Sequence, residues 1–100
     1  MTDKADLQLA LIQSDLAWHD PAANRSHFET QLQQAAGADL VILPEMFSTG
    51  FSMQSAELAE PEGGPTSQWL SEQAQRVNAV ITGSLIIQAA DGSYRNRLLW

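Results

Sequence analysis

Short apolar runs separated by polar stretches predict the strands of this chain. Residues 7–13 (LQLALIQ) and 40–43 (LVIL) have the length of buried strands, and residues 79–87 (AVITGSLII) form a third, β-branched run. Gly83 interrupts the third run, which predicts a bulge or a close backbone approach at that point. These three strands are expected to form the centre of a sheet.

Two segments between these runs carry apolar residues at the period of a helix. The first helix is predicted over residues 21–36, because Asp20 can cap its start, Pro21 suits its first position and Gly37 can end it. The second helix is predicted over residues 65–77. Their buried faces are predicted to consist of Phe28, Leu32, Ala35 and Ala36 in the first helix, and of Trp69, Leu70, Ala74 and Val77 in the second.

The rest of the chain is predicted to form a long loop and a hairpin. Residues 44–65 are rich in Ser, Thr, Gly, Glu and Pro without a sustained period, so they should form a loop with at most one short helical turn. Asp91-Gly92 is typical of a type I′ turn, and residues 94–100 should return as an antiparallel strand. The order β-α-β-loop-α-β-β predicts an α/β fold with a parallel crossover.

Composition limits the size of the fold and its partners. The chain has 100 residues, 44% of them hydrophobic, which is enough for one buried core but too little for two ordinary domains. Twelve acidic residues against five basic ones give a net charge of -7, which disfavours nucleic acid and anionic membranes as partners. No secretory signal or membrane-spanning segment is recognisable, so a cytoplasmic protein is expected.

Glu45 is the strongest candidate for a catalytic residue. It follows a predicted buried strand and Pro44, and active sites form at the carboxyl ends of parallel strands. Its apolar neighbours Met46, Phe47 and Phe51 would desolvate the carboxylate, which is the environment that a general base needs near neutral pH. The alternative from spacing alone is a glutamate that caps the strand or faces solvent.

The two histidines do not predict a metal site. His19 and Asp20 lie in a loop, and His27 and Glu29 are two residues apart on a predicted helix, where side chains do not face each other. Thiolate ligands are excluded because the chain has no cysteine. No metal is therefore expected.

Several segments, spread over nearly the whole chain, together match the sequence of a known family. They are LALIQ in the first strand, DLVILPEMFSTGFSM at the second strand and its loop, AVITGSLI at the third, YRNRLLW after the hairpin, and Trp18 and Asn24 near the first helix. With these segments the chain resembles the carbon-nitrogen hydrolase, or nitrilase, superfamily, and within it the bacterial omega-amidase-like branch. PEMFSTGF is the most specific of them. One departure follows Gly83-Ser84, where many members have an apolar residue, a proline and an acidic residue, whereas this chain continues with LIIQ.

The resemblance implies an αββα sandwich that hydrolyses amide or nitrile carbon–nitrogen bonds with a Glu, Lys and Cys set. Only the glutamate can be placed here, on Glu45, as the general base for the cysteine thiol. Lys4, the single lysine, precedes the first strand, and a cysteine is absent. Residues 1–100 are therefore expected to be the N-terminal part of one carbon-nitrogen hydrolase domain, truncated at Trp100 and inactive alone.

The omega-amidase-like branch implies a small α-keto dicarboxylate monoamide as substrate, such as 2-oxoglutaramate or 2-oxosuccinamate, with Phe47 and Phe51 as walls of its pocket. No cofactor is implied, and the superfamily implies a homodimer or larger homo-oligomer for the complete protein. Arg95 and Arg97 share one face of the last strand and are interpreted as a solvated edge rather than as a substrate-binding cation. Two alternatives stay open: a nitrilase or carbamoyl-amine hydrolase of the same superfamily, and a non-catalytic α/β interaction domain.

Overall fold

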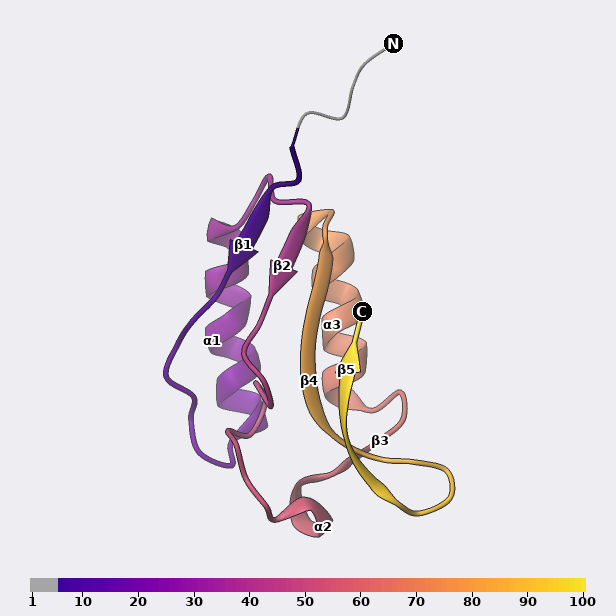
Figure 1. The fold of residues 1–100 in the computed structure, drawn as a ribbon. Coiled ribbons are helices and arrows are strands. Elements are labelled where there is room, and N and C mark those ends of the chain that lie inside the picture. The colour runs from indigo at the N-terminus through magenta and orange to yellow at the C-terminus, as the bar shows by residue number, and fades with distance from the viewer. Residues whose placement is uncertain (1–5) are drawn as a thin grey trace.

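A computed structural model describes residues 6–100; Lys4 lies outside the described residues. The chain forms a five-stranded sheet and two long helices (Figure 1). In chain order the elements are β1 (Leu9–Leu11), α1 (Pro21–Gln34), β2 (Leu40–Ile42), α2 (Ser55–Leu58), β3 (Glu60–Pro61), α3 (Pro65–Val77), β4 (Val80–Gln88) and β5 (Tyr94–Leu99). This arrangement confirms the predicted α/β fold class.

The sheet is parallel at its centre and antiparallel at one edge. β2 pairs in parallel with β1 on one side and with the first residues of β4 on the other, and β3 pairs in parallel with the end of β4. β5 returns antiparallel along β4 over six residue pairs, from Gly83 opposite Leu99 to Gln88 opposite Tyr94. The predicted crossover and the predicted hairpin are both present.

Both long helices begin and end close to the predicted residues. Asp20 caps α1 by accepting a hydrogen bond from the Ala23 N–H (3.0 Å), with Pro21 at the first position. α3 ends at Asn78, whose left-handed backbone (φ 54°) lets its N–H reach the last carbonyls of the helix. α1 is two residues shorter than predicted, because the Ala35 N–H turns back to the Leu32 carbonyl.

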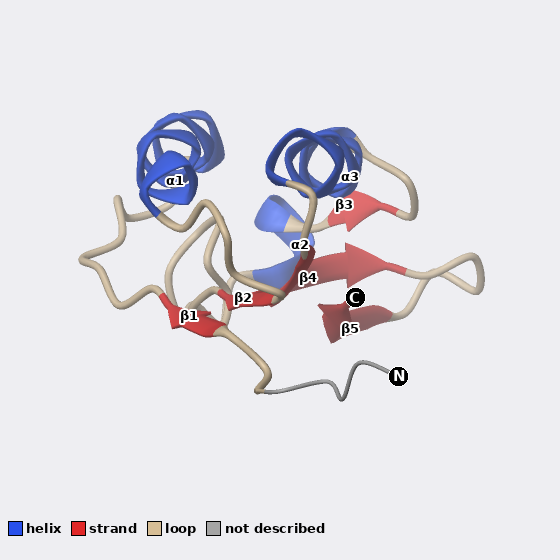
Figure 2. Ribbon diagram, turned by 90° about the horizontal axis from the view of Figure 1, so that it is seen from above, coloured by secondary structure: helices blue, strands red, loops and turns tan. Residues whose placement is uncertain are grey.

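The core lies between the two helices and one face of the sheet (Figure 2). Fully buried side chains of α1 pack there with α3 and with the inward-facing residues of β2 and β4. Gly83 marks a close approach: a Cβ at this position would lie 2.8 Å from Phe47 Cδ1 and 3.1 Å from Leu43 Cβ. The close approach is confirmed, and Gly83 forms the terminal pair of the regular β4–β5 register, opposite Leu99.

The hairpin turn differs from the prediction. A type I′ turn needs a positive φ at both central residues, but at Asp91-Gly92 only Gly92 (φ 86°) has one. The Gly92 N–H instead donates to the Ala89 carbonyl, and the Ala89 N–H donates to the Ser93 carbonyl. The turn therefore has three residues, with the glycine in its left-handed position, because Ala90 enters the turn as well.

The sheet face away from the helices is open among the described residues. Figure 2 shows α1 and α3 on the same side of the sheet. On the other side several large apolar side chains are exposed, namely Leu9, Leu11, Leu98 and Trp100. Within residues 6–100, no helix has both the length and the apolar character needed to cross a membrane.

Candidate active site

The backbone around Glu45 is held against β4 on both sides of the residue. Before it, the Leu43 N–H donates to the Thr82 carbonyl (2.8 Å), and Pro44 then interrupts the ladder because it has no N–H. After it, the Met46 N–H donates to Ser84 Oγ (2.9 Å) and the Phe47 N–H to the Ser84 carbonyl (3.1 Å). Glu45 therefore stands at the carboxyl end of β2, at the predicted edge of the sheet.

The Glu45 side chain is exposed and is fixed by one residue of β5. Asn96 Nδ2 donates a hydrogen bond to Glu45 Oε2 over 2.8 Å. The apolar surrounding expected from the sequence is only partly present. Phe47 turns into the core, whereas Met46 and Phe51 line a hollow beside Glu45 and still leave the carboxylate in contact with solvent. Enclosure of Glu45 would therefore have to come from groups outside the described residues.

Two shallow hollows meet at Glu45 and Asn96. One has a volume of about 240 Å³, and its wall includes Phe51, Met53, Ile86 and Tyr94. The other, of about 390 Å³, extends over the open sheet face past Thr82, Ser84 and Leu98. Since Glu45 and Asn96 border both hollows, a small ligand in either would be within reach of the carboxylate.

The two predicted pocket phenylalanines lie in different surroundings. Phe51 is exposed and lines the smaller hollow beside Glu45. Phe47 is fully buried, with its ring centroid 5.9 Å from that of Phe28 and 6.1 Å from that of Trp69. Phe47 has no face toward either hollow, because the backbone bonds to Ser84 direct its side chain into the core.

The loop after Glu45 is tied to the segment before α1. The His19 N–H donates to the Thr49 carbonyl (2.8 Å), and His19 Nε2 lies 2.8 Å from Ser52 Oγ. Asn24, buried in α1, donates through Nδ2 to the Ser48 carbonyl and to the Ala17 carbonyl, both at 2.8 Å. These contacts give the loop a fixed shape, and no cluster of three or more His, Cys, Asp or Glu side chains suited to a metal occurs within residues 6–100.

Three residues of this arrangement were not predicted as site residues: Asn24, Ser84 and Asn96. Side chains alternate between the two faces of a strand, so the sequence could have placed Asn96 on the face opposite Arg95 and Arg97. The two arginines start from that other face and pair with acidic residues, Arg97 with Glu62 at 2.9 Å and Arg95 with Asp91 at 3.9 Å. Arg95 also borders the smaller hollow beside Glu45. The hydrogen bond from Arg97 lowers the pKa of Glu62 below its usual value, and the hydrogen bond from the Ala90 N–H adds to this effect.

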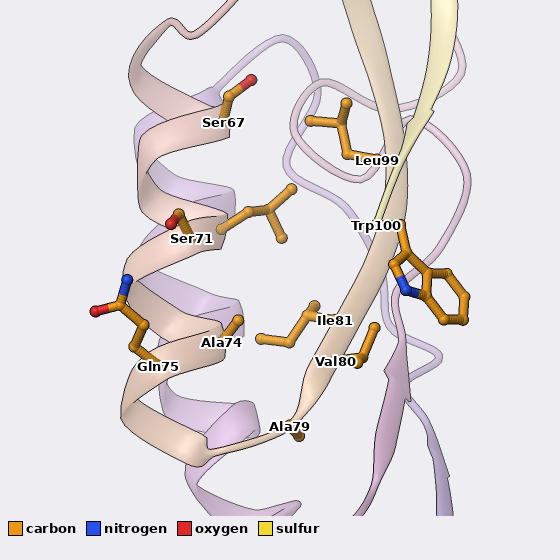
Figure 3. A pocket seen from close by; sticks show the side chains of 10 residues that line it. Ser67, Ser71, Ala74, Gln75, Ala79, Val80, Ile81, Leu99 and Trp100 are labelled. Carbon is orange, nitrogen blue, oxygen red and sulfur yellow. The ribbon is translucent and has the colours of Figure 1, made fainter.

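A separate hollow of about 420 Å³ lies between α3 and β4 (Figure 3). Its walls are mainly apolar and include Leu70, Ala74, Ile81 and Leu99. None of its ten lining residues is acidic, basic or histidine, so it provides no acid–base group. Of these hollows, the two beside Glu45 have a carboxylate in their walls, and the hollow beside α3 has none.

Fold and site together define an α/β protein in which a parallel sheet presents a carboxylate at its carboxyl edge beside an open hollow. The sequence model of the family described as carbon-nitrogen hydrolase matches residues 8–100. This chain belongs to the carbon-nitrogen hydrolase family.

Similar proteins agree with this membership. The chain is 40% identical over 95 residues to omega-amidase YafV of Escherichia coli K12 and 41% identical over 93 residues to omega-amidase YafV of Yersinia enterocolitica, with 93% of this chain and 36% of each relative covered. Among solved structures it is similar to XC1258 from Xanthomonas campestris, a CN-hydrolase superfamily protein with an arsenic adduct in its active site. That match has a TM-score of 0.90 and 45% identity, and it covers 96% of this chain and 36% of the other. The chain thus spans about a third of the length of these relatives.

Proposed function

We propose that this chain is the N-terminal part of an amidohydrolase in which Glu45 is the general base. The observation that carries the proposal is the position of Glu45, which stands at the carboxyl edge of the sheet and borders both hollows. Ser84 fixes the backbone of the next two residues, so the carboxylate is presented by a turn anchored to β4 rather than by a free loop. Membership of the carbon-nitrogen hydrolase family supports amide hydrolysis as the reaction class.

In the proposed reaction, Glu45 takes the proton of a cysteine thiol that other residues of the domain supply. The thiolate attacks the amide carbonyl, and a lysine from the same part of the domain stabilises the oxyanion. The C–N bond breaks as Glu45 returns the proton to the leaving nitrogen, which departs as ammonia and leaves a thioester. Water, deprotonated by Glu45, then attacks the thioester and releases the acid and the free thiol.

The proposed substrate is the terminal amide of a small α-keto dicarboxylate monoamide, such as 2-oxoglutaramate. Two relatives with about 40% identity are omega-amidases, which supports this class. The hollow of about 240 Å³ beside Glu45, with Phe51 in its wall, accommodates a molecule of a few carbon atoms. Phe47 is left out of the proposed pocket because it is fully buried in the core.

The open sheet face supports the proposed place of this chain in a larger domain. We expect a second sheet of the same domain to cover Leu98, Trp100 and the exposed leucines of β1, since exposed apolar patches of this kind usually mark an interface. The relatives are long enough to contain such a sheet, because this chain covers only 36% of them. For the complete enzyme we expect a homo-oligomer in the cytoplasm, which light scattering and cell fractionation can test.

A Glu45→Gln substitution in the full-length protein tests the function. The variant keeps the shape of the side chain, and its amide oxygen can still accept the hydrogen bond from Asn96. It removes the base, so ammonia release from 2-oxoglutaramate should fall at least about 100-fold. Glu72→Gln, at an exposed position of α3, is the matched control and should keep normal turnover. Near-normal turnover of the Glu45 variant would refute the assignment.

The choice of substrate needs a separate comparison. Steady-state ammonia release by the unmodified enzyme is measured with 2-oxoglutaramate, with a nitrile and with a carbamoyl amine. Preference for 2-oxoglutaramate supports the omega-amidase proposal. Preference for either of the other two assigns the same site to a nitrilase or to a carbamoyl-amine hydrolase.

A further inference from the structure

We propose that Asn96 is a positioning residue that orients Glu45 for proton transfer. This inference rests on the proposed function, because it concerns the residue assigned as general base. Asn96 lies 51 residues further along the chain, yet its Nδ2 is 2.8 Å from Glu45 Oε2. It borders the same two hollows as Glu45.

The register of the hairpin places Asn96 on the correct face. Asn96 pairs with Ile86, and its neighbours Arg95 and Arg97 occupy the opposite face, where they pair with Asp91 and Glu62. The alternation of β5 therefore directs a neutral hydrogen-bond donor at Glu45, while both cations pair with other carboxylates and Arg95 still borders the smaller hollow. Only the neutral donor reaches Glu45.

The hairpin holds Glu45 at two points. Ser84, on β4, fixes the backbone after Glu45 through the N–H groups of Met46 and Phe47. Asn96, on β5, fixes the far end of the side chain. Because β4 and β5 are paired over six residues, the two anchor points keep a constant separation. An exposed glutamate would otherwise sample several rotamers, so this bond selects one of them.

The chemistry of an amide donor suits a general base. Asn96 donates a hydrogen bond to Oε2 of Glu45, whereas no described side chain donates one to Oε1 of Glu45. Oε1 is therefore the oxygen that is free to accept a proton. An arginine or lysine at this position would pair with the carboxylate and oppose its protonation. An asparagine orients the carboxylate without adding a full charge.

Two substitutions in the full-length enzyme test this role. Asn96→Leu has a similar volume but no donor, so kcat should fall about 10- to 100-fold while KM stays within about twofold, since the base is misplaced but the substrate pocket remains. Arg97→Gln, one residue further along β5 and on the other face, should keep normal kcat. Circular dichroism and melting temperature confirm that each variant is folded.

The pH dependence of activity in Asn96→Asp distinguishes a positioning role from a merely structural contact. At neutral pH the new carboxylate repels Glu45, and activity should be lost. At lower pH the pair shares one proton, which restores a hydrogen bond between the two side chains, so activity should partly return. Asn96→Leu cannot show this return.

The outcomes separate the two proposals. The positioning role is wrong if the kcat of Asn96→Leu stays within twofold of the unmodified enzyme. It is also wrong if Asn96→Leu loses activity because it unfolds and Asn96→Asp regains no activity at low pH. If Glu45→Gln is inactive in the same experiment, the proposed function survives that result. An active Glu45→Gln variant overturns the proposed function itself.

Discussion

Met46 has a left-handed backbone directly after the candidate base. Its φ is 51°, a conformation that costs a residue with a Cβ about 1–2 kcal/mol. The hydrogen bonds from the N–H groups of Met46 and Phe47 to Ser84 hold it there, and the N–H of Gly50 donates to the Met46 carbonyl. The turn that presents Glu45 is therefore under local strain that β4 maintains.

A β-branched residue at position 46 should be poorly tolerated. Met46→Ile keeps the volume of the buried side chain but adds a branch at Cβ, which the left-handed conformation disfavours. The free energy of unfolding of the full-length protein, measured by urea titration, should fall by about 1–3 kcal/mol. Met53→Ile, at an exposed position with no positive φ, is the control and should change it by less than about 0.5 kcal/mol. Equal stabilities of the two variants would show that the turn is not strained.

At this scale the sequence predicted Glu45 and Phe51 as residues of one site, and the structure places both beside one hollow, while their roles stay predictions. Strand alternation could place Asn96 on a face, but the sequence could not predict that Asn96 and Ser84 contact residues 45–47, because these contacts depend on the register between three strands. It also could not separate Phe47 from Phe51, since both are apolar residues of one loop. The hydrogen bond from the Phe47 N–H to the Ser84 carbonyl holds Phe47 against β4 with its ring in the core, whereas Phe51 stays exposed.

Among the elements, β4 connects the separate parts of the site. It pairs with β2, β3 and β5 and provides the carbonyl and hydroxyl groups that hold the turn at Glu45. Periodicity was sufficient to predict both long helices and the central strands, because these elements bury one continuous apolar face. It missed β3, which has two residues, and it overestimated β1, of which only three residues pair with β2. Short edge pairings depend on tertiary contacts rather than on local pattern.

The contact between Glu62 and Arg97 ties the loop before α3 to β5, and it should respond to acid. Because the pKa of Glu62 is lowered in the folded protein, this contact stabilises the fold above the usual value of 4.5. Its contribution should be lost as the pH falls from 4.5 through the lowered value, since protonation removes the ion pair. The contact is exposed, so the effect should be small.

The measurement is the difference in urea midpoint between the unmodified protein and Glu62→Gln at pH 6 and at pH 3. The unmodified protein should be the more stable of the two at pH 6, and the difference should shrink at pH 3. Glu72→Gln, which removes an exposed carboxylate elsewhere, should show no such change between the two pH values. If the difference in urea midpoint between Glu62→Gln and the unmodified protein is equal at both pH values, the contact does not depend on pH and the prediction is wrong.

On the scale of the whole molecule, the two faces of the sheet differ in a way that bears on the proposed domain. One face is covered by α1 and α3 (Figure 2), whereas the other exposes large apolar side chains. Leu98 is 66% exposed and lies opposite Ser84, close to the hollow that borders Glu45. If a second sheet covers this face, it also supplies the enclosure that Glu45 lacks among the described residues.

Leu98→Glu in the full-length protein distinguishes a covered face from an open one. On an open face the substitution should change the free energy of unfolding by no more than about 0.5 kcal/mol. Between two packed sheets it would bury an unpaired carboxylate, and we expect a loss of about 3 kcal/mol or more, measured by urea titration. Gln33→Glu, at an exposed position of α1, adds the same charge on the helical side and should be nearly neutral. Similar small effects of both substitutions would favour the alternative of a self-contained α/β interaction domain, because the apolar face would then be free to meet a partner.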